Sequence, residues 1–174
     1  YLIESAEKNS LDILTSCGIE CVENDNTTKK MRRKWLSIKN FVGLLGYSEK
    51  NLVRLHKLMY GNWEKFCNDR YNKFQNQIIP GCVGHSVFIS RNGLEKIGLF
   101  DERLQAADWD LSLRTAKRAV ETGDIKYIHV ALDVFHHHYI RLTAKSKPQP
   151  FADAENLITL NNKWSEDEIK KLFP

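Results

Sequence analysis

The spacing of apolar residues changes several times along this chain, and that change limits which folds it can adopt. Residues 11–17 form a short apolar and β-branched run closed by Gly18, as expected of a buried strand. From Met31 onward, apolar residues recur every three or four positions, which places them on one face of a helix. Strand-like runs return at residues 82–89 and 126–135, separated by helical spacing. Strands that alternate with helices predict an α/β fold.

Capping residues and helix breakers predict where the helices begin and end. The chain opens on a helical face with no capping residue ahead of it, so we expect it to begin inside an element. Residues 23–28 have the composition of a loop. The helix that starts at Asp108 is expected to bury Trp109, Leu113, Ala116 and Val120. The other helices are expected at residues 31–45, 48–59 and 63–74, in a short segment ending at Ile97, and at residues 165–172.

Length and composition exclude several classes of protein. The chain has 174 residues, 42% of them hydrophobic and 28% charged, which fits one globular domain with a core. No run of about 18 uncharged apolar residues occurs, and residues 1–28 lack a basic start followed by an apolar stretch. We therefore expect neither a membrane span nor a secretion signal. Four cysteines without a C-x-x-C pair predict reduced thiols in a cytoplasmic protein.

Charge is divided unevenly along the chain. Residues 1–28 hold one lysine against six acids, and residues 76–174 hold 13 basic residues against 13 acids. Residues 29–75 hold 12 basic residues against three acids, a net charge of +9. Such a segment favours an anionic partner such as phosphate, an acidic glycan, a lipid headgroup or nucleic acid. The alternative is an ordinary solvated helix surface.

The densest acidic cluster lies at the start of the helix predicted from Asp108. Asp110 and Arg114 are four residues apart and can pair on a helix, which leaves Asp108 as the free carboxylate. A carboxylate at a helix start can accept a proton from a bound hydroxyl, although Asp108 could also be only a helix cap. The same Asp-Trp-Asp could be a metal-binding pair of sugar-nucleotide enzymes. Its position after a polar loop, rather than at a strand end, argues against that.

Three consecutive histidines follow the last predicted strand. Alternation places His136 and His138 on one face and His137 on the other. Imidazole is the commonest side-chain metal ligand, but no second ligand motif lies nearby, so a self-sufficient zinc site is not expected. His56 and His85 are expected to be core or boundary residues whose polar atoms have partners.

Four segments, in this order, resemble the acceptor-side half of family 2 glycosyltransferases. They are the glycine-containing run at residues 81–91, Gly98-Leu99-Phe100-Asp101-Glu102, Asp108-Trp109-Asp110-Leu111-Ser112-Leu113-Arg114, and Val134-Phe135-His136. The resemblance covers residues 78–140 well and residues 1–20 more faintly. It implies the C-terminal portion of a glycosyltransferase A-type fold with a helical insert.

The resemblance also implies roles for individual residues. Asp108 is similar to the family's general base, with Trp109, Asp110 and Arg114 supporting it. His136, with His138 as the alternate, resembles the histidine that approaches the metal or diphosphate. Gly84 and His85 fall in the substrate-binding run. Ala107 stands where the family usually has a glutamate, which leaves the choice of base open between Asp108 and Asp110.

These roles imply an inverting enzyme that uses Mg²⁺ or Mn²⁺ to move a sugar from a nucleoside-diphosphate donor to a glycan or lipid-linked acceptor. Residues 1–28 would end the nucleotide-binding half, 29–78 would form a basic helical insert, 79–147 the acceptor and base region, and 148–174 the tail. No strand-ending Asp-x-Asp precedes this region, so the chain is expected to be incomplete and inactive alone. We expect a cytoplasmic enzyme, associated with a membrane surface, that does not bind nucleic acid. The alternative is a non-catalytic module that binds an anionic polymer through its basic helices.

Overall fold

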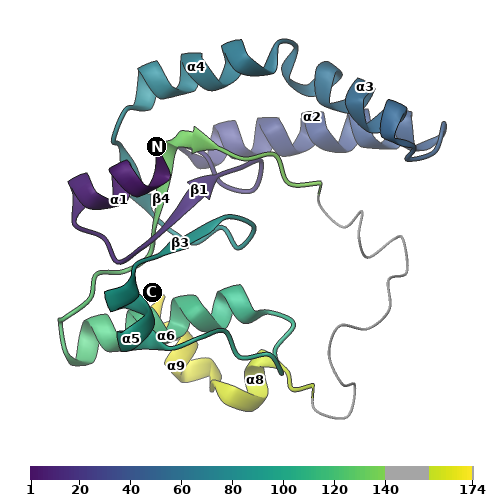
Figure 1. The fold of residues 1–174 in the computed structure, drawn as a ribbon. Helices are drawn as coiled ribbons and strands as arrows, with labels where there is room; N and C mark the ends of the chain where they lie inside the picture. Colours follow the sequence, from purple (N-terminus) through teal and green to yellow (C-terminus); the bar gives the residue numbers. More distant parts are fainter. Residues whose placement is uncertain (140–156, 174) are drawn as a thin grey trace.

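The computed structural model describes residues 1–139 and 157–173. They form an α/β fold with a four-stranded mixed sheet in the order β2-β4-β1-β3 (Figure 1). The two central strands, β1 (Ile13–Cys17) and β4 (His129–Phe135), are parallel. The edge strands β2 (Ile78–Pro80) and β3 (Val87–Ile89) run antiparallel to β4 and β1. The predicted α/β class is confirmed.

The direction of the strands places three chain segments at one end of the sheet. Because β1 and β4 are parallel neighbours, their carboxyl ends lie at the same edge. Because β3 is antiparallel to β1, the start of β3 lies at that edge too. The register between β1 and β4 shifts after Ser16, and beyond it the His136 amide donates to the Cys17 carbonyl at 2.9 Å. The histidines after β4 are therefore held against the end of β1.

Helices cover both faces of the sheet. On one face, Ala6 of α1 (Leu2–Asn9) and Leu11 pack with Leu14 and Ala131. On the other, Ile13 of β1 packs against Leu111 of α6 (Ala107–Glu121). Alternation along β1 explains why neighbouring residues face different helices. All five residues of β1 are buried, as expected of a central strand.

The basic segment forms three helices, α2 (Asp25–Gly43), α3 (Glu49–Tyr60) and α4 (Trp63–Phe74), that lie together beyond one side of the sheet (Figure 1). The predicted inner stripe is confirmed at Trp35, Val42, Leu55 and Met59, which are buried in one cluster with Val130 of β4. The segment therefore shares the main core of the molecule.

Arg70 anchors α4 to the sheet although it belongs to the basic segment. Its Nη2 donates to the Leu132 carbonyl at 3.0 Å, and its Nη1 lies 3.3 Å from a carboxylate oxygen of Glu23. The guanidinium also lies over the rings of Phe74 and Phe135, at 4.7 and 5.4 Å from their centroids. One of the 12 basic residues thus stabilises the fold and is not available to a partner.

Four predictions about local structure are wrong. Residues 25–28 are not loop but the first turn of α2, because the Asn24 side chain accepts a hydrogen bond from the Thr27 amide and caps the helix. Leu45 is exposed because α2 ends at Gly43. The strand predicted over residues 82–89 is only Val87–Ile89, so His85 lies in a loop. Trp109 and Val120 of α6 are exposed.

The C-terminal segment packs back onto α6. It contains α8 (Leu160–Lys163), which the sequence patterns did not predict, and the predicted helix α9 (Glu166–Leu172). Trp164 and Leu172 are buried with Leu113 and Ala116 of α6. The short helix α5 (Arg91–Ile97) ends at Gly98, as predicted. The boundary expected between residues 147 and 148 lies outside the described residues.

Within the described residues, no helix combines the length and apolar character needed to span a membrane.

Candidate functional site

A cleft of about 570 Å³ opens beside the first turn of α6. It lies between four parts of the chain: the end of β2 with the residues that follow it, the start of α6, the segment before β4, and the end of α9. Its lining is mostly apolar and aromatic, with one carboxylate, and consists of Pro80, Gly81, Cys82, Asp108, Trp109, Ser112, Tyr127, Ile128, Leu172 and Phe173. A concave apolar site with few polar groups is typical of small-molecule binding.

Asp110 does not face this cleft. Its side chain is 0% exposed and accepts hydrogen bonds from Arg114 Nε at 2.8 Å and Trp164 Nε1 at 2.8 Å, and it pairs with Lys163 Nζ at 2.9 Å. Burial acts to raise the pKa of Asp110, but the hydrogen bonds from Trp164, Lys163 and Arg114 outweigh it and keep that pKa below the ordinary value of 3.8. The predicted Asp110–Arg114 pair is confirmed, and Asp110 is a buried anchor.

Asp108 is the carboxylate on the cleft wall. The residue at the N-cap of α6 is Ala106, so the alternative that Asp108 caps the helix is wrong. Its side chain is half-buried, and within the described part of the chain no hydrogen bond or ion pair is formed by its carboxylate. A carboxylate in the first turn of a helix is stabilised by the helix dipole. Asp108 is therefore accessible to a ligand.

Gly84 lies directly against Asp108. A Cβ atom built on Gly84 would lie 2.6 Å from both Cβ and Cγ of Asp108, closer than real carbon contacts allow. The loop that carries Gly84 is fixed by the sheet, because the Val83 amide donates to Thr15 Oγ1 at 3.2 Å and the Ser16 amide to the Ser86 carbonyl at 3.2 Å. The glycine thus permits the close approach of this loop to α6.

Trp109 and Cys82 complete the polar and aromatic lining near Asp108. Trp109 is 57% exposed and meets the ring of Phe173 edge-on, with centroids 6.4 Å apart. Burial and the nearby Asp108 carboxylate raise the pKa of Cys82 to about 12, so this residue is a thiol and not a thiolate nucleophile at neutral pH. Aromatic rings beside a carboxylate suit a ligand with both apolar faces and hydroxyl groups.

The C-terminal segment holds the start of α6 in place, which sequence reasoning missed. Lys163 Nζ lies 2.9 Å from carboxylate oxygens of both Asp101 and Asp110. Hydrogen bonds from Arg103 and Lys163 lower the pKa of Asp101 well below its usual range. The Lys163-Trp164 pair carries no local signal of this role, because its partners lie more than 50 positions away in the sequence.

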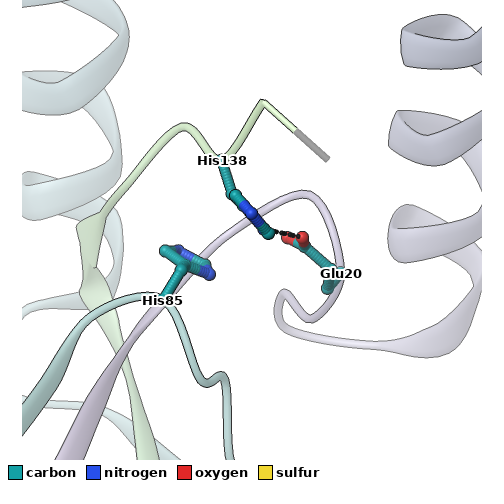
Figure 2. Close-up of side chains that lie close together, drawn as sticks. All are labelled: Glu20, His85 and His138. Atoms are coloured by element: carbon teal, nitrogen blue, oxygen red, sulfur yellow. Dashed lines mark hydrogen bonds and ion pairs between the residues drawn. The ribbon is translucent and has the colours of Figure 1, made fainter. Parts of the chain in front are cut away.

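A second group of polar side chains gathers where β1 and β4 end. His138 Nδ1 lies 2.7 Å from Glu20 Oε1, and the ring of His85 lies 5.0 Å from that of His138 (Figure 2). His136, the first choice for a metal ligand, is exposed, and its ring is 5.1 Å from that of His85. Burial and the neighbouring rings of His138 and His136 lower the pKa of His85 to about 4, so its imidazole is neutral at pH 7.

His137 points the other way, as strand alternation predicted. Its Nδ1 lies 2.6 Å from the Tyr60 hydroxyl, and its ring packs edge-on against Trp35 at 4.9 Å. Burial is the main cause that lowers the pKa of His137 to about 4. His137 is therefore part of the aromatic core under the basic helices, and the half-buried ring of His56 packs against it. The expectation that the polar atoms of His85 have partners is wrong, because its buried Nε2 has none among the described residues.

Comparisons of this chain with protein-family models, with curated proteins and with solved structures found no match. The residues and their geometry therefore carry the functional argument.

Proposed function

We propose that this chain is the acceptor-side part of an inverting glycosyltransferase with an A-type fold, acting from a nucleoside-diphosphate sugar on a glycan or lipid-linked hydroxyl. The observation that carries the proposal is the difference in surroundings between two neighbouring carboxylates. Asp108 faces the cleft without a protein partner in the described part, whereas Asp110 is fully buried in a network of cations. Of the two candidates for the base, only Asp108 can reach a substrate.

In the proposed reaction, Asp108 takes the proton of the acceptor hydroxyl as that oxygen attacks the anomeric carbon of the donor sugar. A bond forms between the acceptor oxygen and the anomeric carbon. The bond between that carbon and the diphosphate breaks, and the nucleoside diphosphate leaves with its electron pair. Attack from the opposite face inverts the configuration of the anomeric carbon.

The lining of the cleft supports a sugar as the acceptor. Trp109, Tyr127 and Phe173 present rings on the walls around the Asp108 carboxylate. Sugar rings have apolar faces that stack on aromatic side chains and hydroxyls that need a polar partner. The half-buried carboxylate supplies that partner at one place, which would select one hydroxyl for transfer.

The reaction would also use a divalent cation, which when bound neutralises charge on the leaving diphosphate. Mg²⁺ prefers oxygen ligands, whereas imidazole suits Mn²⁺ and later transition metals. Of the two histidines named for this role, His138 contacts a carboxylate and His136 is exposed. The residues present thus favour a transition metal over Mg²⁺ and His138 over His136.

Sugar transfer by the full-length gene product tests the proposed base. Asp108→Asn should lower the rate by about 100-fold or more while leaving the fold intact, since general-base catalysis typically contributes 10²–10⁴-fold. Ser112→Ala is a matched control, because this residue also lines the cleft but carries no ionisable group. A rate near wild type for Asp108→Asn would refute the assignment.

A second candidate function, binding to an anionic membrane surface, is favoured by the junction of α2 and α3. Large apolar residues are exposed there: Phe41 is 67% exposed and Leu44 is 85% exposed. Exposed cations on the same two helices include Arg33 and Arg54. Apolar side chains flanked by cations are typical of helices that lie in a membrane interface. This surface, the α2–α3 tip, would bring a lipid-linked acceptor to the enzyme.

A further inference from the structure

Three potential metal ligands converge from three distant parts of the chain. Glu20 lies in the turn after β1, His85 in the loop before β3, and His138 in the segment after β4 (Figure 2). One ligand atom from each of them lies within 4.8 Å of the others. The strand directions explain the convergence, because all three segments meet at the same edge of the sheet.

Two of the ligand atoms are buried and have no partner. Glu20 Oε2 and His85 Nε2 are inaccessible to solvent and make no hydrogen bond with the described residues. A buried polar atom without a partner costs about 1–3 kcal/mol. Both atoms lie 3.1 Å from the point where Gly18 would carry a Cβ atom, so they face the same small space.

The surroundings hold each ligand in place. Gly18 and Cys21 exchange backbone hydrogen bonds of 3.1 Å in both directions, which forms the tight turn that presents Glu20. The ring of His85 lies against the rings of His136 and His138, with centroids 5.1 and 5.0 Å apart.

We infer that Glu20, His85 and His138 form a binding site for a divalent transition metal, with Zn²⁺ the best-fitting ion. Two imidazoles and one carboxylate are an established ligand set for Zn²⁺ with a fourth position open to water or substrate. Ligands at zinc distances in tetrahedral geometry lie roughly 3.3 Å apart. Small side-chain rotations from the present separations would reach that value.

This inference does not depend on sugar transfer, although the two sites are connected. His85 follows Gly84, which lies against Asp108 in the cleft. Residues 82–85 thus run from the cleft to the metal site. A chain that binds Zn²⁺ but transfers no sugar would uphold the site and refute the proposed function, so the two can fail separately.

Calorimetric titration of the untagged chain with Zn²⁺ tests the site. We expect one Zn²⁺ per chain and a higher melting temperature when the metal is present. Glu20→Gln, His85→Gln and His138→Gln should each weaken binding by more than about 100-fold, since loss of a supporting residue alone costs 10–100-fold. Tetrahedral d–d absorption on titration with Co²⁺ should be present in the wild type and lost in each of these variants.

Two further variants test whether Zn²⁺ binds at these three ligands and not elsewhere on the chain. Gly18→Ala changes no ligand, but its Cβ would lie 2.7 Å from His85 Cε1, so it should weaken Zn²⁺ binding while the far-ultraviolet circular dichroism stays that of the wild type. His136→Gln should leave the affinity within about threefold of wild type. The site would be refuted by failure of the folded wild type to bind one Zn²⁺, or by binding that His136→Gln abolishes and His85→Gln does not affect.

Discussion

At the scale of single residues, Asp110 is a buried, paired charge on which the fold depends. Asp110→Asn leaves Arg114 and Lys163 beside a neutral amide in a buried network, and loss of one partner of a buried ion pair typically costs about 3–5 kcal/mol. We expect the free energy of unfolding in urea to fall by about 3 kcal/mol. Asp124→Asn removes an exposed pair with Arg118 at the end of the same helix and should lower the free energy of unfolding much less, because solvent screens exposed ion pairs. Equal effects would contradict the buried role of Asp110.

The lowered pKa of Asp110 predicts how the stability of the folded chain changes in acid. The pKa of Asp110 is lower in the folded chain than its ordinary value of 3.8. As pH falls, the unfolded chain therefore takes up this proton first, and the stability contributed by the charged carboxylate is lost as pH falls through the folded pKa. We expect the stability of Asp110→Asn to change less than that of the wild type between pH values of about 5 and 3. If the free energies of unfolding of wild type and Asp110→Asn change equally over this pH range, the prediction is wrong.

At the scale of elements, the loop at Gly84 and the helix α6 are fitted to each other. In Gly84→Ala, the added methyl group would displace the Asp108 carboxylate, and a misplacement of about 1 Å can cost 10²-fold in rate. We expect kcat/KM of the full-length gene product to fall by at least about tenfold. In the Asp108→Asn background, the same substitution should have little further effect, because the base is already lost. If the two substitutions lower kcat/KM by independent factors that multiply, Gly84 does not act through Asp108.

The attachment of α4 to the sheet rests on Arg70. Arg70→Met removes the donor to the Leu132 carbonyl and the ion pair with Glu23, so we expect a loss of about 2–4 kcal/mol in urea unfolding. Lys65→Met on the same helix is the control, because Lys65 forms only an exposed pair with Asp69 in the described structure, and it should change stability by less than about 0.5 kcal/mol. Similar losses in both variants would contradict an anchoring role.

At the scale of the whole molecule, the α2–α3 tip exposes large apolar side chains within the +9 segment. We expect the chain to sediment with vesicles that contain phosphatidylserine and to be released as salt rises, because screening weakens the attraction of the +9 segment. Phe41→Ser combined with Leu44→Ser should abolish sedimentation, whereas Leu99→Ser, an exposed leucine after α5, should not. Equal binding of wild type and double variant to both vesicles and a soluble polyanion would favour the anionic-polymer alternative.

The spacing of residues by itself determined the local elements of this protein. The strand at Ile13–Cys17 and the inner stripe of α2 and α3 followed from apolar periodicity, because residues on one side of a helix or strand are fixed by local backbone geometry. The pairing of Asp110 with Arg114 was predictable for the same reason, since the two lie four residues apart on a helix. Periodicity was less successful for α6. Leu111 packs on the sheet, and Leu113 and Ala116 pack on the C-terminal segment, whereas Trp109 lies on the cleft wall and is exposed.

Only the tertiary structure decided what surrounds each candidate functional residue. The choice between Asp108 and Asp110 depended on Trp164 and Lys163, and the metal site depended on Glu20 and His85, all far away in the sequence. Such contacts are set by strand order and direction and by the packing of helices on the sheet, which no local spacing encodes. The sequence shows that His138 is a residue type that binds metals. Its two partners, Glu20 and His85, could be identified only from the structure, which brings together the ends of β1 and β4 and the start of β3.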